Sequence, residues 1–158
     1  MTWERGRERV DELLARGELE EVTASEALAD RLVREADKHL TAAGQIVAID
    51  EAGAYQLAYD AARKACAALL AQQGLRATTR GGHVAVQDTV QAQFGGRGGM
   101  AAFGPISRMR RKRAASEYPD MGTPTTTTEE AREAIESANG ILAAAKGLLA
   151  SGNVHPFR

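Results

Sequence analysis

The chain has 158 residues, a formal net charge of -1, 44% hydrophobic and 4% aromatic residues, and one cysteine, Cys66. This length suits one domain with a single hydrophobic core, and one cysteine excludes an internal disulfide framework. No apolar run reaches the roughly 20 residues that a membrane-spanning helix needs. We therefore expect a cytoplasmic, single-domain protein over residues 1–158, with no membrane association.

Helical spacing of apolar residues dominates the first half of the chain. Residues 1–24 predict a short helix, which ends at Gly17, and a connector; the apolar face of this helix carries Trp3, Val10, Leu13 and Leu14. Ser25 predicts the N-terminal cap of a second helix, and Asp50 and Gly74 predict the two ends of a third. The third helix has an apolar seam with 4-3-4-3-4 spacing, formed by Tyr55, Tyr59, Ala62, Cys66, Leu69 and Gln73.

The second half continues the helical pattern. A fourth helix is expected from Gly82 to about Phe94, followed by a glycine-rich mobile loop over residues 95–104. A basic helix then ends at Tyr118, because the residue before a proline disfavours helical geometry. Thr128 is the expected cap of the final helix. No stretch alternates convincingly with period two, so we predict an all-α, up-and-down bundle of five to six helices, whose third and final helices form a central antiparallel pair.

Signatures of the common enzyme classes are absent from the sequence. It contains no phosphate-binding glycine loop, and no two of its histidines have metal-ligand spacing, so we expect neither a cofactor nor a metal. Cys66 lies on the apolar seam and is expected to fill the core. Asp60 lies beside the same seam and needs a cation. An arginine from a neighbouring helix and Lys64, at i+4, are the two candidates.

Positive charge is concentrated in one segment. No acidic residue occurs between Asp88 and Glu117, whereas residues 108–113 read RMRRKR. On a helical wheel Arg110, Arg113 and Glu117 lie on the inward face, where Glu117 or Asp60 could anchor Arg113. The solvent side carries Arg108, Arg111 and Lys112. That side could be a plain solvated face, a surface for the RNA backbone, or a contact for an acidic protein.

Three segments, in this order along the chain, resemble the HEPN superfamily: AYQLAYDAARKACAALLAQQGLRATTRGGH, MRRKRAASEYPD and TTTTEEAREAIESANGILAAAKGLL. These small helical bundles belong to bacterial toxin–antitoxin, phage-defence and RNA-processing systems. The chain is most similar to an actinobacterial branch of uncertain function. The resemblance implies a HEPN-type bundle and a homodimer, whose active members carry Arg-x(4–6)-His. Arg113 takes the arginine position here, but Tyr118 stands where the histidine is expected, which implies a degenerate catalytic pair.

The resemblance and the residues together give three functional hypotheses. The first is a non-catalytic or weakly active HEPN-like protein that binds RNA or a cognate protein partner through its basic helix. Its binding residues would be Arg108, Arg110, Arg111 and Lys112, supported by Asp60 and Glu117. The second is a metal-independent endoribonuclease that uses Arg113 and Tyr118, and the third is a structural dimeric adaptor for an acidic protein. Two other pairs, Arg34/His39 and Arg76/His83, also match the Arg-x(4–6)-His spacing. Two such matches are no surprise by chance in a chain with this many arginines.

Overall fold

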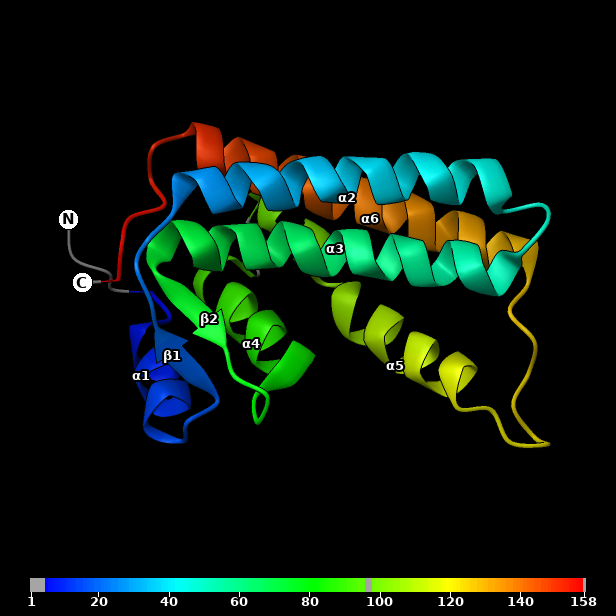
Figure 1. The fold of residues 1–158 in the computed structure, drawn as a ribbon, viewed down its shortest axis with the longest axis horizontal. Helices are drawn as coiled ribbons and strands as arrows, with labels where there is room; N and C mark the ends of the chain where they lie inside the picture. The colour runs from blue at the N-terminus through cyan, green and yellow to red at the C-terminus, as the bar shows by residue number, and fades with distance from the viewer. Residues whose placement is uncertain (1–4, 96–97, 158) are drawn as a thin grey trace.

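The computed structural model describes residues 5–95 and 98–157, without the side chains of residues 98–100, and is mostly helical (Figure 1). Its elements are α1 (Arg7–Ala15), β1 (Leu19–Glu21), α2 (Glu26–Ile46), α3 (Glu51–Gln73), β2 (Leu75–Ala77), α4 (Gly82–Phe94), the 3-10 helix η1 (Gly98–Phe103), α5 (Ile106–Glu117) and α6 (Thr128–Ala150). The prediction of a helical protein is confirmed. Trp3, expected on the first helix, lies outside the described residues.

Capping residues set most of the helix ends where the sequence predicts them. The Ser25 hydroxyl accepts the Leu28 N–H at 3.0 Å and begins α2, and Gly74, with φ of +74°, ends α3 in the left-handed conformation. The final helix begins one residue earlier than predicted. Thr127, not Thr128, is the cap, because its hydroxyl accepts the Glu130 N–H while the Glu130 carboxylate accepts the Thr127 N–H, each at 3.1 Å.

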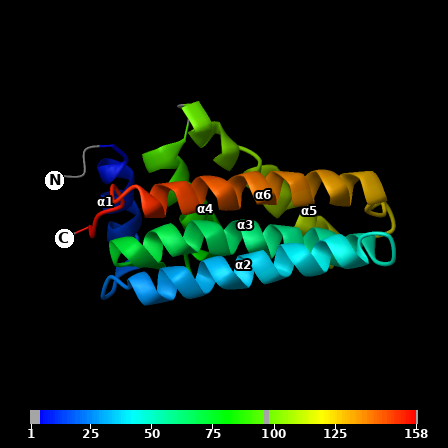
Figure 2. The same cartoon turned by 90° about the horizontal axis from the view of Figure 1, so that it is seen from above.

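Helix α3 lies at the centre of the fold. Figure 2 shows α2 and α6 on either side of it, and α4 and α5 lie against its remaining face (Figure 1). Small side chains allow the backbones to approach closely; the buried alanines of α3 are Ala54, Ala58, Ala61, Ala62, Ala65, Ala68 and Ala71. Cys66 is fully buried among them, as predicted, and burial raises the pKa of its thiol to about 12.

The relative direction of α3 and α6 corrects a prediction. We expected an antiparallel pair, but the two helices run in the same direction (Figure 1). Their N-terminal ends meet, where Thr128 donates a hydrogen bond to Glu51 at 3.2 Å. The physical reason is the connection: α5 carries the chain back along α3, so α6 must return parallel to it. Helix α2 is antiparallel to both (Figure 1).

A two-stranded antiparallel ribbon corrects the expectation of a strand-free fold. Strand β1 pairs with β2, with Leu19 opposite Ala77 and Glu21 opposite Leu75. Each strand has three residues, too few for a period-two pattern to be visible in the sequence. The ribbon also positions the start of α4. A Cβ at Gly81 would overlap the carbonyl oxygen of Glu18, so the chain passes close to the residue that precedes β1 just before α4 begins.

The segment expected to be a mobile glycine-rich loop is partly structured. Residues 96 and 97 lie outside the described part, but residues 98–103 form η1. Phe103, at the end of η1, is fully buried in the main core cluster. Its burial holds the segment against α4 and α6, and the prediction of a loop over residues 95–104 is wrong there. None of the helices in residues 5–95 and 98–157 is long and apolar enough to cross a membrane.

Candidate functional site

Helix α5 carries the basic residues singled out in the sequence. Ile106 and Met109 are buried and pack it against the core. Arg108 and Arg111 are exposed, as predicted. Lys112 is not in solvent: its Nζ pairs with Glu130 Oε2 of α6 at 3.1 Å, and its side chain is only 23% exposed. The prediction of a solvent-exposed Lys112 is wrong because α6 passes beside α5. The sequence pattern of α5 alone does not reveal this neighbour.

The other side of α5 faces α3 and the start of α4. Arg110 and Arg113 of α5 and Arg63 of α3 lie near enough to His83, the second residue of α4, for their charges to lower the pKa of its imidazole; we call these four residues the arginine–histidine cluster. Its floor is Tyr59 of α3, whose hydroxyl lies 2.9 Å from His83 Nδ1. The Arg113 guanidinium lies over the Tyr59 ring, 5.9 Å from its centroid, within the range of a cation–π contact.

The protonation states of Tyr59 and His83 follow from burial and the surrounding charges. Burial raises the pKa of Tyr59 to about 12, so its hydroxyl keeps its proton at neutral pH and can donate to Nδ1 of the imidazole. Burial, followed by the positive charges of Arg63 and Arg113, lowers the pKa of His83. The imidazole is therefore neutral at pH 7; in the tautomer whose Nδ1 accepts from Tyr59, its proton lies on Nε2.

The three arginines of the cluster have unused hydrogen-bond donors. The Nε–H groups of Arg63, Arg110 and Arg113 are buried and have no hydrogen-bond acceptor among residues 5–95 and 98–157. Arg63 Nε lies 3.6 Å from Asp60 Oδ1, which is close enough for an ion pair but too far for a hydrogen bond. Two carboxylates, those of Asp60 and Glu117, accompany three guanidinium groups. Buried donors without acceptors are costly, so this arrangement can hold an anion that supplies oxygen acceptors.

The two predicted supporting carboxylates have different outcomes. Glu117 pairs with Arg113 at 2.7 Å between Oε2 and Nη1, one of the two anchors expected for Arg113. Asp60 is paired with neither of its predicted partners, but with Arg63, three residues on along its own helix. Lys64 is engaged elsewhere, because its Nζ lies 3.1 Å from Glu35 Oε2 of α2.

Tyr118 does not join the cluster. It follows the last residue of α5, the residue is 80% exposed, and its hydroxyl makes no hydrogen bond within the described parts of the chain. Sequence reasoning instead missed His83. The sequence signal for this residue is the Gly-Gly-His at the start of α4. That signal is weak because the spacing between Arg76 and His83 is one that chance alone predicts. Arg76 pairs with Glu20 across the ribbon at 2.8 Å.

We expect Tyr118→Phe to change the free energy of unfolding by less than about 0.5 kcal/mol, as is usual for an exposed side chain. Arg113→Gln should lower it by about 1 kcal/mol, because it removes an ion pair within α5 and a cation–π contact. Urea denaturation of both variants and the wild type measures these differences. A loss of more than about 1 kcal/mol in Tyr118→Phe would show that the phenol has a structural contact in solution.

No group of three or more histidine, cysteine, aspartate or glutamate side chains is placed to hold a metal ion in the part of the chain that the structure describes. Comparison of the chain with protein-family models, with curated proteins and with solved structures finds no significant match.

Proposed function

We propose that the protein is a HEPN-like RNA-binding protein, non-catalytic or weakly active, in which α5 and the arginine–histidine cluster hold the sugar–phosphate backbone. One observation carries this proposal: three guanidinium groups from two helices, each with a buried Nε–H that has no acceptor among the described residues, place positive charge beside one neutral histidine. A phosphodiester supplies several oxygen acceptors and one negative charge in a small volume. Arginine matches it with a planar fork of donors.

The surroundings of the cluster extend the same chemistry. Arg108 and Arg111, exposed on α5, add positive charge to the same helix, which contains no carboxylate before Glu117. The Nε2–H of His83 offers one more donor. Exposed aromatic rings are scarce here, because Phe103 is buried and Tyr118 lies at the far end of α5. Backbone contacts therefore carry most of the expected affinity.

The test is the binding of a fluorescently labelled single-stranded RNA, followed by anisotropy over a range of KCl concentrations. Release of counterions predicts that the logarithm of the association constant falls linearly with the logarithm of the salt concentration. The slope is about -0.7 for each phosphate contact on a single strand, so three arginine contacts predict about -2. Absence of binding at low salt, or binding that does not respond to salt, would overturn the proposal.

A second candidate function is favoured by the position of His83. A neutral imidazole beside arginines has the residue types needed for metal-independent RNA cleavage, in which the 2′-hydroxyl attacks the adjacent phosphate. In that case His83 replaces Tyr118 as the proton-transfer group. Cleavage of RNA in EDTA that is lost in His83→Gln and retained in Tyr118→Phe would select this candidate. RNA that is bound and stays intact would select the binding protein.

The homodimer implied by the resemblance is part of the proposal. Two copies that meet along α5 would bring two arginine–histidine clusters to one surface, and a strand of RNA could contact both. Light scattering at tens of micromolar protein tests this. A monomer would leave each cluster to act alone. A dimer without RNA binding would instead favour the adaptor for an acidic protein.

A further inference from the structure

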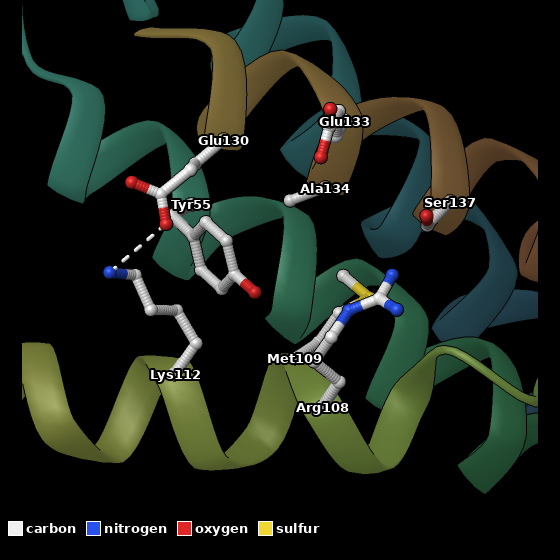
Figure 3. Close-up of a pocket in the computed structure, with 8 residues that line it drawn as sticks. All are labelled: Tyr55, Arg108, Met109, Lys112, Glu130, Glu133, Ala134 and Ser137. Carbon is white, nitrogen blue, oxygen red and sulfur yellow. Dashed lines mark ion pairs between the residues drawn. The ribbon is translucent and has the colours of Figure 1, made fainter. Parts of the chain in front are cut away.

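A second recess lies between α5 and α6 (Figure 3), and no residue of the arginine–histidine cluster lines it. We call it the α5–α6 pocket; its polar lining is Tyr55, Arg108, Lys112, Glu130, Glu133 and Ser137. Its volume is about 220 Å³. Sites for drug-sized ligands usually have roughly 300–1,000 Å³, so this pocket suits a single ring system rather than a whole nucleotide.

One end of the pocket is closed by an ion pair, and the charged residues on its two facing sides have no ion-pair partner among the described residues. The ion pair between Lys112 and Glu130 closes one end (Figure 3). Glu133 on α6 and Arg108 on α5 then lie on opposite walls, and neither forms an ion pair within residues 5–95 and 98–157. Between them the hydroxyl of Tyr55, a residue only 6% exposed, points into the pocket without a hydrogen-bond partner in the same residues.

We propose that this pocket binds a guanine ring, an inference that rests on the RNA-binding function proposed above. An uncharged ring with an acceptor edge and a donor edge would satisfy both walls without adding a charge. Guanine has both edges: O6 and N7 accept from an arginine fork, and N1–H and the N2 amino group can donate together to one carboxylate. Adenine has no donor pair for Glu133 on its Watson–Crick edge, and its N6 amino group would oppose the donors of Arg108.

Helix α5 connects the pocket to the backbone site. Arg108 faces the pocket, whereas Arg110 and Arg113, two and five residues further along the same helix, belong to the cluster. A strand that crosses α5 can therefore place a phosphate at the cluster and an unstacked base in the pocket. A free guanine nucleotide would present the same ring as a guanine in RNA. The experiment therefore tests an RNA strand and a free nucleotide separately.

The first arm compares a labelled ten-residue oligoadenylate with the same strand carrying one central guanine. We expect the guanine strand to bind the full-length protein at least about tenfold more tightly, as one good bidentate contact predicts. Glu133→Gln should abolish this ratio, because an amide does not accept both guanine donors. Glu136→Gln, at an exposed position three residues on in α6, is the matched control and should keep the ratio.

The second arm titrates guanosine monophosphate and adenosine monophosphate alone. Binding of the guanine nucleotide that Glu133→Gln removes would support the pocket and identify a free nucleotide as its source. Equal affinities for the two strands, together with no selective binding of the guanine nucleotide, would overturn the inference. Salt-sensitive binding of oligoadenylate would then still support the RNA-binding function, so the failure of each proposal can be told apart.

Discussion

Replacing Arg110 and Arg113 together by glutamine is expected to weaken the binding of single-stranded RNA by at least about 100-fold, because each charge-assisted hydrogen bond contributes roughly 1.5–3 kcal/mol and two are lost. The salt dependence should fall as well. Two lost phosphate contacts reduce the magnitude of the slope by about 1.4. Anisotropy titrations at several KCl concentrations measure both quantities for the wild type and the variant.

A matched control separates this local effect from a change in net charge. Arg34 and Lys38 are exposed on α2, on the side of α3 away from α5 (Figure 1), so Arg34→Gln/Lys38→Gln removes the same charge at a distant surface. The control should bind RNA almost as well as the wild type and with nearly the same slope. Equal losses in the two double variants would contradict a defined site. Folding of both is checked by urea denaturation.

Tyr59→Ala is expected to lower the free energy of unfolding by about 3–5 kcal/mol. Tyr59 is 1% exposed, lies in the main core cluster, and supports both His83 and Arg113. Tyr59→Phe keeps the ring and loses only the hydrogen bond to His83, so about 0.5–1.5 kcal/mol is expected. Urea denaturation measures both variants. A cost below about 1 kcal/mol for the alanine variant would show that the ring does not support the core.

Local chemistry explains why much of the helical fold could be predicted from the sequence. A serine, an aspartate and a glycine determine helix ends through contacts within a few residues, and the seam of α3 repeats regularly enough to identify its buried face. The inward face of α5 follows in the same way from Ile106 and Met109. The i,i+4 pair of Arg113 with Glu117 is also local, which is why it could be anticipated.

The features that escaped prediction depend on contacts between distant segments. The ribbon joins three-residue strands whose pairing partners come from separate parts of the chain, and the parallel arrangement of α3 and α6 depends on the path of the connection through α5. His83 meets the arginines of α5 only through tertiary packing, since the first turn of α4 has no side-chain cap or charge that marks it. The pairing of Lys112 with Glu130 likewise needs two helices to be placed side by side.

The pKa of His83, measured with and without RNA, tests the central claim most directly. In the free protein, burial and the arginines hold this pKa below the ordinary value of 6.5. A phosphate held in the cluster adds negative charge beside the imidazole and favours its protonated form, so the pKa should rise when RNA binds. His39, whose pKa is lowered mainly by burial and by Lys64 and less by Arg63, is the internal comparison and should move less than His83.

The measurement is an NMR titration of the imidazole Cε1–H signals from pH 5 to 8, with His83 assigned by its absence in His83→Gln. We predict a pKa for His83 that is below 6.5 in the free protein and higher with saturating single-stranded RNA, while the pKa of His39 changes less. An unchanged pKa of His83 in the RNA-bound protein would contradict the placement of a phosphate in the arginine–histidine cluster.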